Sequence, residues 1–183
     1  MEHKNERVPN TPLASGDGGD KILLLVRHAK SSWEIGTLTD FERPLNNRGI
    51  KDAPAMAKRL KAENIAIDAF VSSPAKRAKK TAEFFAETYL LDNNAVIFIS
   101  KLYHADTDAF FDVITNLDDA LNTVAIFSHN NGITEFANQL TDSVQIDNMP
   151  TCGIFAVKVN IAKWADFKKA KKEFLFFDYP KNV

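Results

Sequence analysis

Three polar segments of this 183-residue chain gather side chains that bind anions. Residues 27–29 read Arg-His-Ala, residues 72–81 carry two serines and Arg77, and residues 128–130 read Ser-His-Asn. Each segment directly follows a short apolar run. Guanidinium forks, imidazoles and hydroxyls can all donate hydrogen bonds to the charged oxygens of a phosphoryl group. The pattern predicts one anion pocket that contains no carboxylate.

Arg27 and Arg77 each offer a planar fork of N–H groups to such a phosphoryl group. The chain has neither a Walker-type Gly-Lys-Ser/Thr loop nor an Asp cluster to hold magnesium, so these cations would have to replace a metal. A histidine is then the natural nucleophile, because a neutral imidazole can attack phosphorus and nearby guanidiniums disfavour its protonated form. His28 directly follows a buried strand, which would hold its ring rigidly. We therefore expect chemistry without a metal or another cofactor.

The hydrophobic pattern places the three segments at the ends of strands. Residues 22–26 are a continuous apolar run, typical of a strand buried on both faces, whereas residues 47–63 carry apolar side chains at helical spacing. Pro54 fits only the first turns of that helix. Further strands are predicted at 68–72, 96–99, 123–127, 153–159 and 173–177, and further helices at 75–90, 106–118 (capped by Asp106 or Thr107) and 131–140.

This alternation indicates an α/β three-layer sandwich, in which helices flank a mostly parallel central sheet. In such a sheet ligands bind beyond the carboxyl ends of the strands, where the three polar segments lie. Residues 43–49, which precede or begin the first helix, either line the pocket entrance or attach the loop to that helix.

The composition describes one ordinary globular domain. A formal net charge of −1 gives no reason to expect a nucleic acid or an anionic membrane surface as partner, and no apolar run is long enough to span a bilayer. The single cysteine, Cys152, excludes a disulfide framework and favours the cytoplasm. Residues 1–20 have no hydrophobic period and predict a flexible N-terminal arm before a single domain at 21–183.

The three polar segments resemble the signature segments of the histidine phosphatase superfamily, whose fold is called phosphoglycerate-mutase-like. The second segment matches as Ser-Ser-Pro-x-x-Arg-Ala-x-x-Thr. The match is closer to the short SixA-type phosphohistidine phosphatases. It rests on residues 27–33, which are followed by Asp-Phe-Glu-Arg-Pro-Leu at 40–45. The resemblance covers residues 21–160. Ala29 and Ser128 stand where superfamily members frequently have glycine.

The resemblance implies that His28 becomes transiently phosphorylated and that Arg27, Arg77 and His129 bind the phosphoryl oxygens. Ser31 and Asn130 are further candidate phosphate ligands.

Larger superfamily members supply the acid for the leaving group from an inserted segment, for which this chain has little room. His104 is the candidate acid in its place, against the simpler interpretation of a partly buried loop histidine. A site without a dedicated acid favours phosphohistidine over phosphate esters, because an alkoxide leaves poorly unless it is protonated, whereas a leaving imidazole nitrogen can take its proton from solvent.

The sequence therefore predicts a metal-independent phosphatase for a phosphorylated protein of the histidine phosphotransfer type. A small-molecule phosphomonoesterase of the same superfamily is the alternative. A mutase is less favoured, because it would need a cover over its substrate, for which we expect no room in this short chain. From another class, a phosphate- or phosphohistidine-binding module without catalysis remains open.

Overall fold

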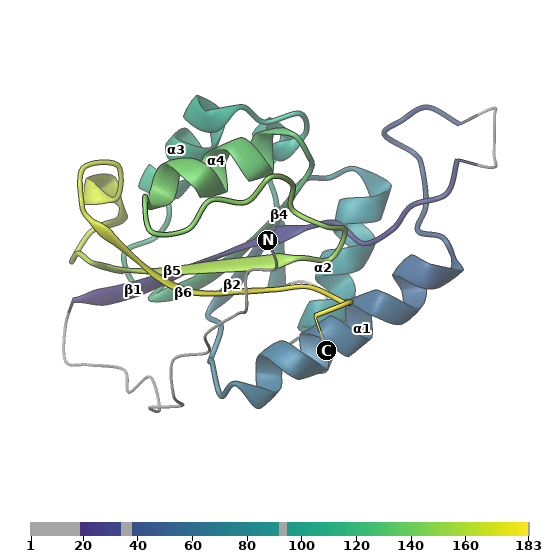
Figure 1. The fold of residues 1–183 in the computed structure, drawn as a ribbon, viewed down its shortest axis with the longest axis horizontal. Coiled ribbons are helices and arrows are strands. Elements are labelled where there is room, and N and C mark those ends of the chain that lie inside the picture. Colours follow the sequence, from purple (N-terminus) through teal and green to yellow (C-terminus); the bar gives the residue numbers. More distant parts are fainter. Residues whose placement is uncertain (1–18, 34–37, 92–94, 183) are drawn as a thin grey trace.

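The computed structural model describes residues 19–33, 38–91 and 95–182 of the chain. These residues form one central sheet covered by helices (Figure 1). In chain order the elements are β1 (Asp20–Arg27), α1 (Asn47–Ala62), β2 (Ala69–Ser72), α2 (Lys76–Thr88), β3 (Val96–Phe98), α3 (Thr107–Thr115), β4 (Thr123–Ser128), α4 (Gly132–Leu140), β5 (Ile154–Asn160) and β6 (Lys172–Asp178).

The six strands lie in the order β3-β2-β4-β1-β5-β6. β1, β2, β3 and β4 pair in parallel, and β5 and β6 are added to the other side of β1 in antiparallel fashion. Arg27 at the end of β1 lies opposite Ser128 of β4, and Ser72 at the end of β2 lies opposite Phe127. The three polar segments therefore leave the sheet at one edge, and the mostly parallel α/β sheet is confirmed.

Helices cover both faces of this sheet, with α3 and α4 on one side and α1 and α2 on the other (Figure 1). β1 contributes to both hydrophobic cores. Leu23 and Leu25 pack into the core beneath α3 and α4, whereas Leu24 and Val26 pack into the core beneath α1 and α2. Because successive strand side chains point to opposite faces, a strand between two helical layers must be apolar throughout. This explains the continuous apolar run before His28.

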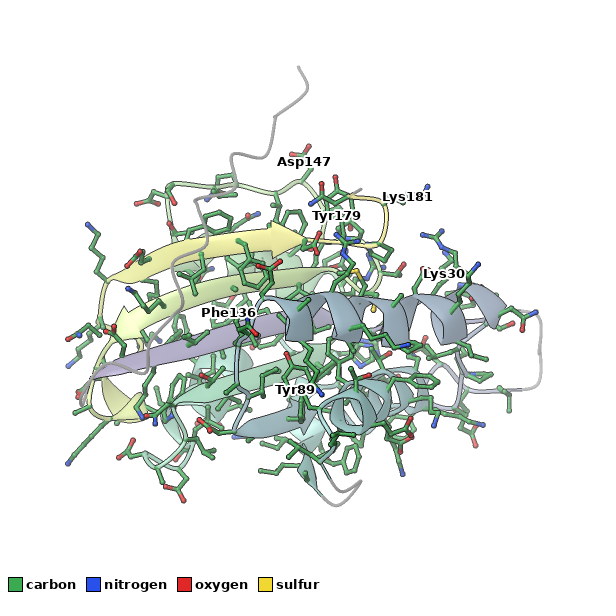
Figure 2. All side chains as sticks on the ribbon, turned by 90° about the horizontal axis from the view of Figure 1, so that it is seen from below. Lys30, Tyr89, Phe136, Asp147, Tyr179 and Lys181 are labelled. Atoms are coloured by element: carbon green, nitrogen blue, oxygen red, sulfur yellow. The ribbon has the colours of Figure 1, made fainter. Side chains whose placement is uncertain are left out.

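The loop between β1 and α1 is fastened to the end of β1 at Gly49. A Cβ at this position would lie 2.2 Å from the carbonyl oxygen of Lys30, so only glycine allows the approach. Asn46 donates its backbone N–H to the same oxygen at 3.0 Å, and its side chain caps α1 by accepting from the N–H of Gly49. Figure 2, in which Lys30 is labelled, shows this end of the molecule. Residues 46–49 thus attach the loop to the helix.

Pro54 is the eighth residue of α1 and lies at the end of its second turn. Proline has no N–H, so the carbonyl of Ile50 loses its intrahelical partner there. Hydrophobic burial keeps the helix continuous nonetheless: its inner face packs against the sheet through Ala53, Met56, Ala57 and Leu60.

The arm predicted at residues 1–20 lies outside the described residues except for its last two positions. Asp20 is already the first residue of β1 and pairs with Asn160 of β5, so the strand begins earlier than its apolar run predicts. Within the described ranges, no helix has the length and apolar character needed to cross a membrane.

Candidate active site

His28 lies directly after β1 and is buried, with 7% of its surface exposed. Its Nδ1 is 2.8 Å from the carbonyl oxygen of Ala29, and Nε of Arg77 is 3.2 Å from its Nε2. A carbonyl oxygen only accepts and a guanidinium only donates, so Nδ1 must carry the proton and Nε2 the lone pair. These two partners fix one tautomer of a neutral imidazole, with Nε2 turned toward Arg77.

Three distant segments hold the backbone around His28. Its N–H donates to the carbonyl of Ser128 in β4, and the N–H of Ala29 donates to Oγ1 of Thr81 in α2. The N–H of Cys152 lies 3.1 Å from the carbonyl oxygen of Arg27 and 3.2 Å from that of His28. Cys152 is fully buried, and this burial raises the pKa of its thiol, so packing is its role in the fold. The nucleophile candidate is therefore rigidly placed.

Arg27 reaches across to the loop that precedes β5. Its Nη1 donates to the carbonyl oxygen of Met149 at 2.6 Å, while its Nε is buried and has no hydrogen-bond partner among the described residues. A buried donor without a partner is costly, so this N–H is suited to a ligand oxygen.

His129 follows β4 and is 4% exposed. Its ring centroid lies 5.0 Å from that of His28, and its Nε2 is 2.8 Å from Oγ of Ser73. Its Nδ1 is buried without a hydrogen-bond partner in the described ranges. When the Ser73 hydroxyl donates to Nε2, Nδ1 carries the proton and becomes a donor for an anion. The structure thus brings His28, Arg77 and His129 together, with the unpaired Nε of Arg27 on the strand end next to them.

Both histidines are held neutral. Burial lowers the pKa of His28 from 6.5 to about 3, opposed by the hydrogen bond to Ala29 and reinforced by the charges of Arg77, Arg27 and Arg43. Burial also lowers the pKa of His129, with further lowering from His28 and Arg77. A neutral imidazole at His28 keeps its lone pair free for attack over the whole physiological pH range.

The lowered pKa values predict an acid-sensitive fold. In the unfolded chain both histidines take up protons near pH 6.5, whereas in the folded chain they do not, so stability falls as the pH drops below that value. Between pH 6 and pH 4.5 the free energy of unfolding should fall by about 1.4 kcal/mol per pH unit for each histidine. Urea unfolding at several pH values measures this slope. His129→Asn should lower the slope by about half, and an unchanged slope would contradict the expectation.

Asp40 corrects the expectation that no carboxylate enters this site. Its Oδ2 accepts from Nη2 of Arg77 at 2.9 Å and from the hydroxyl of Tyr103 at 2.8 Å, and its Oδ1 accepts from Nη1 of Arg43 at 2.7 Å. The backbone carbonyl of Asp40 accepts from Nη1 of Arg77 as well. Partial burial acts to raise the pKa of Asp40. The hydrogen bonds from Tyr103, Arg77 and Arg43 outweigh this effect and hold the pKa well below its usual range. The carboxylate is charged and orients Arg77.

Ser31 and Asn130, the two further candidate phosphate ligands, form hydrogen bonds with other side chains of the protein. Oγ of Ser31 accepts from Nη2 of Arg43, and the guanidinium of Arg43 also stacks on the exposed ring of Trp33. The amide of Asn130 donates to Asn148, and its oxygen accepts from the hydroxyl of Thr134 at 2.7 Å. Both side chains shape the loops around the pocket, and their role as phosphate ligands stays a prediction.

His104 lies at the rim, with 64% of its side chain exposed. Its Nε2 is 3.9 Å from Oδ2 of Asp40, and its ring centroid is 6.4 Å from that of His129. The residue adopts a left-handed backbone with φ of 54°. It is therefore close enough to the site to meet a substrate's leaving group, and its role as the acid stays a prediction.

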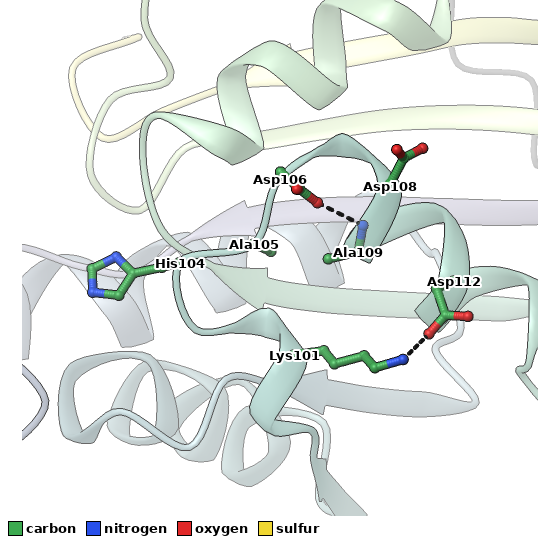
Figure 3. Close-up of a pocket in the computed structure, with 7 residues that line it drawn as sticks. All are labelled: Lys101, His104, Ala105, Asp106, Asp108, Ala109 and Asp112. Atoms are coloured by element: carbon green, nitrogen blue, oxygen red, sulfur yellow. Dashed lines mark hydrogen bonds and ion pairs between the residues drawn. The ribbon is translucent and has the colours of Figure 1, made fainter.

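A pocket with a volume of about 400 Å³ adjoins this segment and has His104 among its lining residues (Figure 3). Its walls carry Asp106, which caps α3, and Asp112, which pairs with Lys101. In Figure 3 the ring of His104 points away from these two carboxylates. Because its lining includes three aspartates and one lysine, which is paired with Asp112, this pocket does not suit a phosphoryl group.

In the described ranges, no group of three or more His, Cys, Asp or Glu side chains is arranged to hold a metal ion. The site instead combines guanidiniums with two neutral imidazoles. Such a set can bind a tetrahedral oxyanion and present one imidazole lone pair to its central atom.

Three residues of the site have no role in the sequence interpretation: Asp40, Tyr103 and Ser73. The first stands in the Asp-Phe-Glu-Arg-Pro-Leu stretch and the last in the Ser-Ser-Pro segment, so the motifs mark them without revealing their contacts. For Tyr103 the only signal is its position next to His104.

Comparison with known proteins agrees with this geometry. Residues 23–94 match the model of the Histidine phosphatase superfamily (branch 1). An uncharacterized protein of Mycobacterium leprae is 29% identical over 167 residues, which cover 85% of this chain and 100% of that protein. A structure of the protein histidine phosphatase SixA complexed with tungstate has a TM-score of 0.72 at 21% identity, covering 88% of this chain and 98% of that one. A mycobacterial glucosyl-3-phosphoglycerate phosphatase complexed with VO3 has a TM-score of 0.67 at 15% identity, covering 87% and 99%.

Proposed function

We propose that the chain is a metal-independent phosphohistidine phosphatase of the histidine phosphatase superfamily, whose model matches residues 23–94 and whose phosphoglycerate-mutase-like fold it has. Its substrate is a phosphorylated protein of the histidine phosphotransfer type. The phosphoryl group passes through a covalent intermediate on His28.

The observation that carries this proposal is the fixed tautomer of His28. The Ala29 carbonyl holds the proton on Nδ1, and the Arg77 N–H lies against Nε2, the atom that must attack. The same N–H can turn to a phosphoryl oxygen when substrate enters, because a guanidinium prefers a charged oxygen to a neutral nitrogen. The unpaired Nε of Arg27 and Nδ1 of His129 supply two more donors.

The reaction then runs in two steps. Nε2 of His28 forms a bond to phosphorus while the bond from phosphorus to the substrate's leaving atom breaks, and the leaving group takes that electron pair. Water next attacks the phosphorylated His28, which releases inorganic phosphate and returns the electron pair to Nε2. Arg27, Arg77 and His129 stabilise the charge on the phosphoryl oxygens in both steps.

Two features favour phosphohistidine as substrate. Near His28 the described part of the chain offers no protonated carboxyl, since the nearby Asp40 is held ionised, so a leaving group that needs little help from an acid is suited to the site. The fold is also shared with a protein described as a protein histidine phosphatase.

The alternative is a small-molecule phosphomonoesterase of the same superfamily. It is favoured by the likeness to a glucosyl-3-phosphoglycerate phosphatase and by the position of His104, which could protonate an alkoxide. A module that binds phosphate without catalysis fits less well, because it has no use for a nucleophile with a fixed tautomer.

A substrate panel tests the proposal. A phosphohistidine protein, a sugar phosphate and p-nitrophenyl phosphate are assayed with and without a chelator, and radiolabelled enzyme is trapped at low temperature. We expect turnover that is insensitive to chelator, fastest on the phosphohistidine protein, with an acid-labile label on the enzyme. Equal or faster turnover of the sugar phosphate would refute the substrate, and chelator-sensitive activity would refute the metal independence.

A further inference from the structure

Asp40 is a carboxylate at the mouth of a site for a dianion, which the proposed function does not explain. It receives three side-chain hydrogen bonds, from Arg77, Arg43 and Tyr103. A fold that needed only to orient the guanidiniums could do so with neutral carbonyl groups, as Met149 does for Arg27. Orienting the guanidiniums therefore does not by itself explain why a charged carboxylate stands at position 40.

The carboxylate lies on the outer side of the site. Its side chain is 37% exposed, whereas those of Arg77 and Arg43 are 5% and 11% exposed. One guanidinium separates it from the nucleophile, because Nη2 of Arg77 donates to Asp40 while Nε of the same group donates to His28. Asp40 therefore lies beside the place of a phosphoryl group bound at His28, on the solvent side from which a substrate's leaving group departs.

Asp40 also keeps capacity for one more partner. An ionised carboxylate has about four acceptor positions. Oδ2 uses two, for Arg77 and Tyr103, and Oδ1 uses one, for Arg43. Partial burial acts to raise the pKa of Asp40, but the hydrogen bonds from Tyr103, Arg77 and Arg43 outweigh it and keep the group ionised. Asp40 can accept a proton donor from the substrate and cannot itself act as the acid.

A leaving imidazole presents such a donor. When the nitrogen that does not carry phosphorus is protonated, the P–N bond breaks to release a neutral imidazole. When that nitrogen is unprotonated, the ring must leave as a poor imidazolate anion. A fixed carboxylate that accepts from the N–H stabilises the protonated ring and thereby the better leaving group.

We propose that Asp40 binds the ring N–H of a phosphohistidine substrate and stabilises its protonated imidazole as leaving group, an inference that rests on the proposed function. Nε2 of His28 forms the bond to phosphorus, the P–N bond gives its electron pair to the departing nitrogen, and the proton stays on the ring's other nitrogen. No separate acid is needed. Asp40 is then a catalytic residue that selects for imidazole over alcohol leaving groups.

The surroundings of Asp40 fit a flat ring. The rings of Phe41 and Tyr103 meet edge to face with centroids 5.1 Å apart, and Phe41 is 40% exposed. The ring of Tyr103 also lies 5.5 Å from that of His129 at an interplanar angle of 84°. The exposed part of the Phe41 ring can pack against a planar guest that lies beside Asp40.

The test compares two small substrates in Asp40→Asn. Imidazole leaves 1-phosphoimidazole readily only when its ring is protonated, whereas the leaving group of p-nitrophenyl phosphate needs no proton. If Asp40 only positioned Arg77, its loss would slow both substrates equally. We expect the ratio of kcat/KM for phosphoimidazole to that for p-nitrophenyl phosphate to fall about tenfold or more. Asp40→Glu, which keeps the charge, should restore most of the ratio, and it serves as the folded comparison should the Asn variant unfold.

Glu42→Gln is the matched control, because this neighbouring carboxylate is solvent-exposed and contacts Thr39. It should leave the ratio unchanged. The role of Asp40 would be overturned if Asp40→Asn slowed both substrates equally or slowed neither. It would also be overturned if the ratio of kcat/KM values fell as far in Asp40→Glu as in Asp40→Asn. Wild-type enzyme that cleaves p-nitrophenyl phosphate but not phosphoimidazole would refute the phosphohistidine assignment, and wild-type enzyme that cleaves neither would refute the phosphatase itself.

Discussion

Replacing His28 with asparagine is expected to reduce phosphatase turnover by at least about 10³-fold, which places it below detection in most assays. Asparagine approximates the size of the ring but has no lone pair that can form a stable bond to phosphorus. Initial rates on p-nitrophenyl phosphate and on a phosphohistidine protein measure the loss. The trapped radiolabel should disappear in parallel.

Tungstate binding supplies the control for this variant. The donors of Arg27, Arg77 and His129 remain in His28→Asn, so the oxyanion should still bind and raise the melting temperature. Retained turnover would overturn the covalent mechanism. A wild-type protein that binds tungstate yet shows no turnover would instead favour the binding module.

Replacing Arg77 with alanine should lower kcat/KM by about 10²-fold or more. The change removes the N–H that lies 3.2 Å from Nε2 of His28 and leaves the carboxylate of Asp40 without its most buried partner. A bare carboxylate at the mouth then repels the incoming dianion. Steady-state kinetics on p-nitrophenyl phosphate give the loss.

Two further variants separate charge from geometry at this position. Arg77→Lys keeps the charge but not the planar fork that holds His28 and Asp40 together, so it should recover only part of the rate. Arg48→Ala, which removes an exposed guanidinium paired with Asp52 on α1, should retain wild-type kcat/KM. Wild-type rates in Arg77→Ala would contradict the assigned geometry.

The sequence predicts which polar segments converge, because short-range rules decide where they lie. The apolar run before His28 must be a buried strand, and carboxyl ends of parallel strands meet at one edge, so residues after β1, β2 and β4 converge. The helix starts follow likewise from periodicity and capping, as when Asp106 caps α3 by accepting from Ala109, whereas α3 ends at Thr115, three residues before the predicted end.

The contacts of Asp40 could not be predicted in the same way. Its partner Tyr103 is 63 residues further along the chain and comes from an irregular segment, which no hydrophobic period describes. A loop folds back according to the donors it meets, and the pattern of its own residues does not reveal those donors.

The loop before β5 determines when the site becomes complete during folding. Met149 holds Arg27 across 122 residues of sequence, and the N–H of Cys152 closes on the carbonyls of Arg27 and His28. Residues 23–94 alone would therefore contain His28, the proposed nucleophile, but would lack the loop that holds the side chain of Arg27 and the backbone of His28. Contacts between residues so far apart in the sequence form slowly during folding. Phosphatase activity should accordingly appear only when the whole chain has folded, which makes it a sensitive reporter of complete refolding.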